Sequence, residues 1–374
     1  MTYIPFDLVI DVRKAFDTGI GTYIRQVVPR VIDRLGVPAT VWVPQGERDR
    51  HAYLSACNVR VVEVHAPPLG FAEQLALRRL LDERSLLWAT SLAHPLLRHG
   101  PLVATVHDVV QLALGGSQGV PRRVSLAAHV LLSSLRRRAS ALMAVSSFTR
   151  SEFLQRVGSP TCGDIAVTPL GVDAAWFDAA ATRAEPSAVP RFVSVGSVRP
   201  HKNLARLLQA FALVADRLPH ELVFAGLAAR HGEHLQWLET LPSFVRPRVH
   251  FAGHMEDAEL RALVARADAL VFPSLYEGFG LPALEAMAAG CPVLASSAAS
   301  LPEVCGSAAA AYFEPGSVEQ IAQALLRHAA LTQAERQTLV ERGVAHARTF
   351  TWERTADLTA AVIDTALRQG GGTR

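Results

Sequence analysis

The second half of the chain alternates short apolar runs with amphipathic segments. Apolar runs of this length predict buried strands, and apolar positions three and four residues apart between them predict helices. The predicted strands are 191–195, 222–225, 249–252, 269–273, 292–295 and 310–313. The predicted helices are 204–218, 235–241, 256–267, 282–289 and 318–330. Short apolar strands separated by helices indicate a parallel sheet covered on both faces.

The first half shows a similar but less regular pattern. Apolar runs predict strands at 8–11, 41–44, 61–64, 102–105 and 141–145. Apolar positions from Ile24 to Leu35 predict an amphipathic helix, in which Pro29 predicts a kink or a late start. A chain of 374 residues is long enough for two domains. We therefore expect an α/β protein with two doubly wound domains facing each other across a cleft, joined by a linker at 176–190.

The composition is that of an ordinary globular protein, with 50% hydrophobic and 19% charged residues. The four cysteines have neither metal-ligand spacing nor a disulfide pattern, which predicts free thiols in a reducing cytoplasm. Asp7 and Asp11 interrupt the first apolar run, so no secretory signal is expected. We expect a cytoplasmic protein.

Positive charge is concentrated in the first half. Residues 1–175 carry 19 basic and 14 acidic residues, and the other residues carry 18 and 20. Arginines cluster at 78–79, 122–123 and 136–138. Two interpretations stay open, solvated helix faces or contact with anionic lipid on the inner membrane face. Nucleic acid is not expected as a partner, because no aromatic residues interleave with these clusters.

Two glutamates, Glu277 and Glu285, stand eight residues apart in an otherwise uncharged stretch. Residues 274–281 follow a predicted strand, and doubly wound sheets bind ligands at the carboxyl ends of their strands. A carboxylate accepts two hydrogen bonds from a vicinal diol, as in ribose recognition. The two glutamates are therefore candidate ligands for sugar hydroxyls, with solvated loop and helix residues as the alternative.

The same stretch predicts an anion site. Gly278 and Gly280 allow a ligand to approach the main chain closely. Pro282 suits the first helical position, so the free N–H groups of that first turn would face an anion.

A second cluster, residues 195–203, also joins a strand to a helix. Arg199 and Lys202 lie three residues apart, and Lys202 is one of only two lysines in the chain. Two cations beside a helix N-terminus suit a diphosphate, and a solvated loop is the alternative.

Two further candidates lie in the first half. Gly19 and Gly21 form a Gly-x-Gly before the first amphipathic helix, but Ile24 occupies the third position of a dinucleotide fingerprint. This pattern fits a close backbone approach to a phosphate and argues against a dehydrogenase. His107 follows the strand 102–105 and would point into the cleft, with a structural histidine as an equal alternative. The sequence contains no nucleophile, Walker or metal-binding motif, so we expect neither a metal nor a resident cofactor.

Together these stretches resemble the retaining glycosyltransferases of family four, which have the GT-B fold. The resemblance spans nearly the whole chain and is strongest in GSVRPHKNLARLLQAF, DALVFPSLYEGFGLPALEAMAAGCPVLAS and SLPEV, supported by GIGTYI, HD, VTPLGVD and FTWERTA. It implies Rossmann-like acceptor-binding and nucleotide-sugar-binding domains at 1–175 and 191–350. It also implies that a final helix at 351–374 returns to the first domain.

The resemblance implies a role for each candidate. Glu277 would bind the donor sugar's hydroxyls, Glu285 the ribose, and Arg199 and Lys202 the diphosphate, with His107 near the transferred sugar. The catalytic set is thus His107, Arg199, Lys202 and Glu277. The remaining donor-binding positions are Gly19, Gly21, Gly196, Gly253, His254, Gly278, Phe279, Gly280 and Leu281, of which Gly253 and His254 would line the nucleobase.

The implied reaction is same-face transfer through an oxocarbenium-like transition state. Arg199, Lys202 and the helix N-terminus would stabilise the departing nucleotide diphosphate without a divalent metal. The motifs look most like bacterial mannosyl- and rhamnosyl-type enzymes, which favours GDP-mannose, with UDP-sugars as the alternative. PHKN at 200–203 departs from the more usual Pro-Arg-Lys-Asn.

The implied acceptor is a glycan or a polyprenyl-diphosphate-linked sugar in O-antigen, capsule or exopolysaccharide assembly. Two rival functions share this architecture, a sugar-nucleotide 2-epimerase and a non-catalytic nucleotide-sugar-binding subunit.

Overall fold

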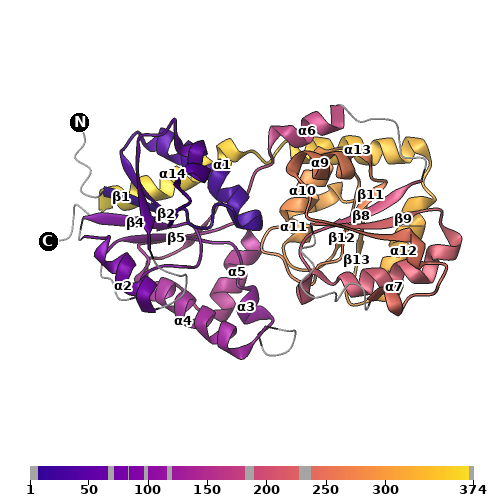
Figure 1. Cartoon of the computed structure of the whole chain (residues 1–374), viewed down its shortest axis with the longest axis horizontal. Helices are drawn as coiled ribbons and strands as arrows, with labels where there is room; N and C mark the ends of the chain where they lie inside the picture. The colour runs from indigo at the N-terminus through magenta and orange to yellow at the C-terminus, as the bar shows by residue number, and fades with distance from the viewer. Residues whose placement is uncertain are drawn as a thin grey trace. The chain divides into compact units, whose positions relative to one another are not determined.

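The computed structural model describes residues 7–65, 71–82, 84–96, 100–115, 120–181, 189–226 and 237–369. The chain forms two compact units, each built around one parallel sheet (Figure 1). The first unit comprises Met1–Gly171 and Trp352–Arg374, and the second comprises Val172–Thr351.

The sheet of the first unit has the strand order β3-β2-β1-β4-β5-β6-β7, with every neighbouring pair parallel. Its strands are β1 (Asp7–Asp11), β2 (Ala39–Pro44), β3 (Val59–Val64), β4 (Ser85–Ala89), β5 (Leu102–Val106), β6 (Ala141–Ala144) and β7 (Ile165–Val167). Its helices are α1 (Thr18–Leu35), the 3-10 helix η1 (Arg48–Leu54), α2 (Phe71–Arg79), α3 (Val110–Ala113), α4 (Arg122–Arg138), α5 (Ser147–Arg156) and α14 (Trp352–Gln369). The strand order reverses between β1 and β4, as in a Rossmann sheet.

Helix α14 closes the first unit by packing on α1. The Thr355 hydroxyl donates to the Pro169 carbonyl at 2.6 Å, and Arg30 and Arg34 of α1 pair with Glu353 and Asp357. Helix α1 continues through Pro29 and starts at Thr18. Gly19 and Gly21 therefore lie inside its first turns, and not before the helix as the sequence pattern predicted.

The second unit repeats the architecture with the strand order β10-β9-β8-β11-β12-β13. Its strands are β8 (Arg191–Val195), β9 (Glu221–Ala225), β10 (Val249–Gly253), β11 (Ala269–Phe272), β12 (Val293–Ser296) and β13 (Ala311–Phe313). Its α-helices are α6 (Ala174–Ala181), α7 (Leu204–Val214), α9 (Asp257–Arg266), α10 (Leu281–Ala288), α11 (Leu301–Cys305), α12 (Val318–Ala329) and α13 (Gln333–Ala347). Its 3-10 helices are η2 (Pro200–Lys202), η3 (Ala215–Arg217), η4 (Arg246–Arg248) and η5 (Gly306–Ala308). The expected fold class, α/β with two Rossmann-like parallel sheets, is confirmed.

One predicted boundary needs correction. The linker predicted at 176–190 begins inside α6, because Trp176 is buried and α6 packs on α9 and α10 of the second unit. The alanines around this tryptophan allow the helix to pack closely on its neighbours. Residues 182–188 of the predicted linker, like 235 and 236 of a predicted helix, lie outside the described residues.

The central strands of the second sheet, β9, β8, β11 and β12, are buried on both faces. Phe192, Phe224 and Phe313 from three strands pack with Phe211 of α7 and Leu325 of α12 in one apolar cluster. Each of the five side chains is 2% exposed or less. Such a core holds the strand ends rigidly, so loops leaving the sheet start from fixed positions.

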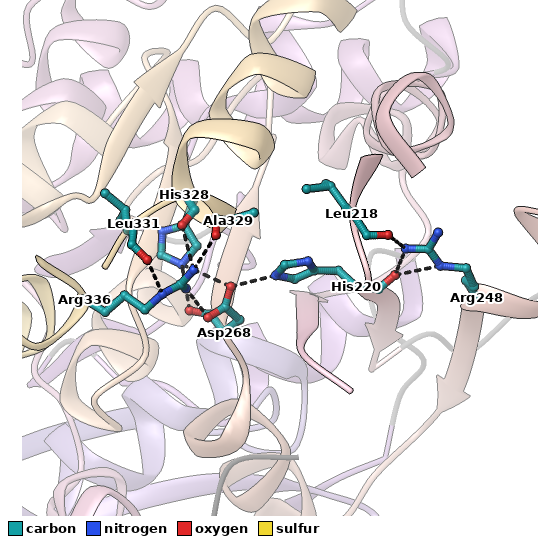
Figure 2. A network of polar contacts seen from close by, with 8 residues as sticks. All are labelled: Leu218, His220, Arg248, Asp268, His328, Ala329, Leu331 and Arg336. Atoms are coloured by element: carbon teal, nitrogen blue, oxygen red, sulfur yellow. Dashed lines mark hydrogen bonds and ion pairs between the residues drawn. The ribbon is translucent and has the colours of Figure 1, made fainter. Parts of the chain in front are cut away.

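A polar network ties the amino edge of the same sheet (Figure 2). Asp268, just before β11, pairs with His220 at 2.9 Å and with Arg336. His328 Nε2 donates to the Asp268 carbonyl at 3.0 Å, and Arg336 donates to the carbonyls of His328 and Ala329, each at 2.9 Å. Beside it, Arg248 donates to the carbonyls of Leu218 and His220, so this edge is cross-linked from η3 to α13.

Burial alone would raise the pKa of Asp268. The hydrogen bond from His220 and the charges of His328 and Arg336 outweigh burial and lower it. The carboxylate is therefore held ionised as the centre of the network.

Candidate active site

The loops after β8 and β11 meet at the carboxyl edge of the second sheet. These two strands are hydrogen-bonded neighbours, and the strand order reverses between them. Leu275 N–H donates to the His201 carbonyl at 2.7 Å, which joins the two loops directly. Open α/β sheets bind ligands at such a reversal point, and both sequence-predicted loops of this half lie there.

Lys202 and Glu277 form an ion pair across these two loops. Lys202 Nζ lies 2.7 Å from Glu277 Oε1, and their side chains are 16% and 13% exposed. Lys202 Nζ also lies 5.4 Å from the centroid of the Phe272 ring, within cation–π range. Two predicted site residues from segments 75 positions apart are thus brought into contact in a largely buried place.

Asn203 holds in place the loop after β8 that carries Lys202, called the lysine loop below. Its side-chain amide donates to the carbonyls of Pro273 at 3.0 Å and Pro315 at 2.7 Å. Its backbone is left-handed, with φ 59°, a conformation that asparagine tolerates better than most residues. Sequence reasoning placed Asn203 at the helix start but did not identify this role, which depends on contacts far away in the chain.

Three glycines lie at or just after the carboxyl ends of the neighbouring strands β8, β9 and β10. We call Gly196, Gly226 and Gly253 the glycine floor. Gly196, Gly226 and Gly253 have φ values of 147°, 81° and 69°. Gly196 N–H donates to Ala225 O at 3.0 Å, and Gly226 N–H donates to Gly253 O at 2.8 Å. The Lys202 side chain lies over Gly196, since a β-carbon there would be 3.6 Å from Lys202 Cε.

The prediction from sequence included Gly196 and Gly253 but missed Gly226. The signal was available, because Gly226 follows an apolar run in the same way as Gly196 does. The residue after Gly253, His254, is exposed on the same strand end.

The loop that carries Glu277 leads into α10. Gly280 has φ 99°, and a β-carbon there would lie 2.5 Å from Leu301 Cδ2, so only glycine fits. The buried Ser300 hydroxyl donates to the carbonyls of Glu277 at 3.0 Å and Phe279 at 2.8 Å, and so fixes the loop. Ser300 was seen in the sequence only as part of the SLPEV motif.

Side chains of the predicted donor-binding stretch point inward. Phe279 and Leu281 are 5% and 7% exposed, and Phe279 packs edge-on against Phe350. Phe279 and Leu281 therefore offer little side-chain surface to a ligand. The first N–H groups of α10 start here, beside the Glu277 loop.

Glu285 lies among α6, α9 and α10. Burial and the neighbouring carboxylate of Asp257 raise its pKa to about 8, while a hydrogen bond with Trp176 opposes the rise. Asp173 also raises the pKa and Arg261 lowers it. Glu285 is thus a mostly protonated group at neutral pH in the absence of a ligand.

The lysine loop contains two further ionisable residues, Arg199 and His201, which differ in exposure. Arg199 is exposed. Burial, followed by the positive charge of Lys202, lowers the pKa of His201 to about 4, so this histidine is neutral at pH 7. Lys202 is therefore preceded along the chain by a neutral imidazole at His201 and an exposed guanidinium at Arg199.

The remaining candidates belong to the first unit. His107 Nε2 donates to the Thr90 carbonyl at 2.9 Å, and its ring packs edge-on against Tyr23 at 4.8 Å between centroids. Burial lowers the pKa of His107 to about 4, so the ring is neutral with Nδ1 as its acceptor. This arrangement joins the segments that follow β4 and β5, next to the strand-order reversal between β1 and β4.

The two glycines of α1 have different surroundings. A β-carbon at Gly21 would lie 2.6 Å from the Ala15 carbonyl oxygen, whereas Gly19 is exposed and open. The close approach of Ala15 thus gives Gly21 a structural reason, in addition to the predicted approach to phosphate. In the described residues, no group of three or more His, Cys, Asp or Glu side chains is placed to hold a metal ion.

Two family models together match most of the chain. "Glycosyltransferase Family 4" matches residues 18–176, and "Glycosyl transferases group 1" matches residues 180–343. The boundary between the two matches falls near the boundary between the two structural units.

Among curated relatives, O-antigen chain mannosyltransferase B of Escherichia coli is 28% identical over 366 residues, covering 90% of this chain and 93% of the relative. The MMP alpha-(1->4)-mannosyltransferase of Mycolicibacterium hassiacum is 33% identical over 231 residues, covering 60% of this chain and 54% of that protein.

Solved structures give the same fold at lower identity. Anabaena Alr3699/HepE, solved in complex with UDP-glucose, matches with a TM-score of 0.75 and 20% identity, covering 96% of this chain and 99% of that one. With the two Rossmann-like sheets, these matches show that the chain belongs to the group 1 glycosyltransferases of the GT-B fold.

Proposed function

We propose that this chain is a retaining, metal-independent mannosyltransferase that uses GDP-mannose. Its acceptor would be a glycan or a polyprenyl-diphosphate-linked oligosaccharide in O-antigen-type polysaccharide assembly. The Lys202–Glu277 pair supports this proposal most directly, because it sets a cation and a hydroxyl acceptor side by side at a strand-order reversal.

In this proposal Glu277 accepts hydrogen bonds from the hydroxyls of the transferred sugar. Lys202 and Arg199 bind the diphosphate, and the N–H groups at the start of α10 add partial positive charge. As the bond to the anomeric carbon breaks, negative charge grows on the diphosphate oxygen, and these fixed donors stabilise it. Because the protein itself supplies this charge, the proposed reaction needs no divalent ion.

The nucleoside would lie over the glycine floor of Gly196, Gly226 and Gly253, where no β-carbon blocks its approach. Glu285 would hold the ribose diol, and the exposed His254 would lie near the base. His107 would act near the transferred sugar as a neutral acceptor, since its Nε2 proton is already donated to Thr90.

The choice of mannose comes from the sequence motifs and from the names of two relatives, one of which matches along nearly its whole length. The Anabaena neighbour was solved with UDP-glucose, which makes a UDP-sugar the alternative donor.

A thermal-shift panel of GDP, UDP, ADP and their sugars tests the donor, because a ligand that binds only the folded state raises the melting temperature. GDP and GDP-mannose should give the largest shifts. A larger shift with UDP would overturn the choice of GDP-mannose.

Transfer of radiolabelled mannose to a lipid-linked acceptor tests the reaction. Glu277→Gln keeps the shape and an oxygen acceptor for Lys202 but removes the charge, so transfer should fall about a hundredfold. An epimer appearing on the free nucleotide sugar would support the epimerase instead. Unchanged glycan assembly in cells carrying Glu277→Gln, with loss on deletion, would indicate a non-catalytic subunit.

The configuration of the product tests retention, and a chelator tests metal independence. An α-linked product from the α-linked donor is expected by NMR, with full activity in EDTA. A β-linked product or loss of activity in EDTA would contradict those two parts of the proposal separately.

A further inference from the structure

The loop after β12 contains a strained backbone conformation. Among the residues that the structure describes, the two non-glycine residues with a positive φ are Asn203, at 59°, and Ala299, at 57°. This conformation is unfavourable for alanine, because its β-carbon crowds the following carbonyl oxygen. Asn203 offsets the cost with side-chain hydrogen bonds, which an alanine cannot form. The contacts of neighbouring residues must therefore hold Ala299 in place.

Ala299 occupies a tight turn that leads into α11. Leu301 N–H donates to the Ala298 carbonyl at 3.4 Å across the turn, and Ala298 N–H donates to the Ser296 hydroxyl oxygen at 3.0 Å. The φ values of Ala299 and Ser300 are 57° and −77°, a sign pattern typical of a type II′ turn. The first central position of such a turn usually holds glycine. Alanine at this position therefore stores strain.

The turn contacts the loop after β11 that carries Glu277, called the Glu277 loop, at two points. Ser300 is fully buried, and its hydroxyl donates to the carbonyls of Glu277 at 3.0 Å and Phe279 at 2.8 Å. A hydroxyl has one proton, so the two carbonyls share it. The buried Leu301 side chain also lies so close to Gly280 that a β-carbon there would be 2.5 Å from Leu301 Cδ2. The turn therefore fixes the main chain of the Glu277 loop.

These contacts also set the direction in which the peptide groups of the loop face. In a trans peptide unit the C=O and the N–H point in opposite directions. Because the carbonyls of Glu277 and Phe279 face Ser300, the N–H groups of Gly278 and Gly280 face the other side of the loop. Both glycines are predicted donor-binding positions. A relaxed turn would therefore redirect N–H groups that are expected to meet the ligand.

We propose that Ala299 and Ser300 are positioning residues that set how tightly the sugar of the donor is bound, by fixing the main chain of the Glu277 loop. The inference rests on the proposed function, in which this loop binds the transferred sugar. In that function the nucleoside lies elsewhere, over the glycine floor. The turn should therefore change the affinity for the sugar and leave the affinity for the nucleotide as it is.

Strain and hydrogen bonding oppose each other in this turn. Ala299 favours a negative φ, and the Ser300 hydrogen bonds prevent the change. Without the hydroxyl, the turn relaxes and the Glu277 loop loses its fixed direction. Glycine at position 299 adopts a positive φ without this penalty, so the turn should persist even when the hydroxyl is absent. The effects of substitutions at the two positions should therefore not be additive.

The test measures the Kd of GDP and of GDP-mannose for the full chain by titration calorimetry. Ser300→Ala should weaken GDP-mannose binding about tenfold and leave GDP binding within about twofold, because only the sugar-binding loop loses a hydrogen bond. Ala299→Gly should leave both Kd values unchanged and raise the melting temperature by about 2 °C, because strain is relieved. The double variant should bind GDP-mannose within about threefold of wild type, because glycine keeps the turn.

Ser134 of α4 provides a matched control. It is a serine with 5% exposure in the first unit, and its hydroxyl lies 3.1 Å from His94 Nε2. Ser134→Ala also loses a buried hydrogen bond, so its melting temperature should fall as in Ser300→Ala. The ratio of its two Kd values should stay at that of wild type.

Three outcomes would overturn the inference. Equal weakening of GDP and GDP-mannose binding in Ser300→Ala would show that the turn serves only the fold. Unchanged binding of both would show that the loop does not need the turn. A double variant as weak as Ser300→Ala would refute the role of Ala299. If Ser300→Ala does not fold, Ala299→Val decides, because a β-branched residue resists a positive φ more strongly and should weaken GDP-mannose binding alone; unchanged binding in that variant would refute the inference.

Failure of this inference is distinguishable from failure of the proposed function. If wild type binds GDP-mannose and Ser300→Ala keeps the wild-type ratio of Kd values, only the inference fails. If wild type binds UDP and UDP-glucose instead, the choice of donor fails, and the same variants are compared with that pair. If wild type binds none of these four compounds, the proposed function fails and the inference fails with it.

Discussion

The two edges of the second sheet use polar residues in opposite ways. At the amino edge, Asp268 collects contacts from His220, His328 and Arg336, and these contacts join strands to helices (Figure 2). At the carboxyl edge, Lys202 and Glu277 mainly contact each other. The charged groups of the amino edge therefore stabilise the fold.

The main chain differs between the edges as well. The carboxyl edge carries Gly196, Gly226 and Gly253, which have positive φ and no side chains of their own to cover the backbone. At the amino edge, Arg248 covers the carbonyls of Ala215, Leu218 and His220. In the proposed function, the second sheet therefore keeps its stabilising charges at the amino edge and its ligand-binding groups at the carboxyl edge.

Lys202→Met should have the largest effect on activity. Removing the cation from the proposed diphosphate site should lower kcat/KM about a thousandfold. The unfolding free energy should also fall by about 2 kcal/mol, because Glu277 is 13% exposed and loses the cation that pairs with it. Steady-state transfer assays and a melting curve check both parts. Arg327→Met, an exposed cation on α12, serves as control, and equal losses in both variants would remove the contrast between edges.

Asp268→Ala should have the largest effect on stability. It leaves Arg336 and His220 without their carboxylate in a half-buried place, which should cost about 3 kcal/mol of unfolding free energy in urea titrations. Below the melting transition, kcat/KM should stay near wild type. Asp364→Ala breaks the exposed pair with Arg368 and should cost below about 1 kcal/mol. A large loss of activity in folded Asp268→Ala would contradict the division.

Glu285 makes stability depend on pH. Its pKa in the folded chain is raised from 4.5 to about 8, so between these values the folded chain keeps a proton that the unfolded chain releases. Stability from this group is therefore present below the unfolded pKa and is lost as pH rises through 8. Glu285→Gln should melt progressively higher relative to wild type as pH rises across this window. If the melting temperatures of the two proteins differ by the same amount at every pH in this window, Glu285 is ionised throughout the window.

Gly226→Ala should have the smallest effect on stability and activity. Gly36→Ala is a closely matched control. A methyl group at φ 81° should cost about 1 kcal/mol of stability. Gly36 at the end of α1 has φ 60° with open space around it, so Gly36→Ala carries a similar backbone cost. Only Gly226→Ala should also reduce the thermal shift with GDP, because its new β-carbon rises from the glycine floor. Equal GDP shifts would show that the floor does not contact the nucleotide.

The sequence predicted much of the carboxyl edge because each of its residues follows an apolar run directly. Gly196 follows β8 directly, Lys202 and Glu277 lie in the loops that leave β8 and β11, and in a parallel sheet those strand ends share one edge. The rule needs no knowledge of which strands are neighbours. It would also have found Gly226, had it been applied to the strand at 222–225.

The amino-edge network could not be predicted in this way. His220, Asp268, His328 and Arg336 are spread over more than a hundred residues, and each alone reads as a polar residue beside a strand or helix. The surroundings of Glu285 were missed for a related reason. They depend on α6, which from Trp176 onward falls inside the predicted linker at 176–190 and in the structure packs on α10.

Helix α14 has a consequence for the order of events on the ribosome. Tyr23, Ile24, Val27, Val28 and Val31 of α1 are fully buried in the finished first unit, which includes α14. Yet α14 is translated only after the whole second unit, so the first unit cannot complete its core until the second unit has been made. The inserted domain can mature while its host is still incomplete, and a nascent chain stalled before α14 should be a preferred client of chaperones.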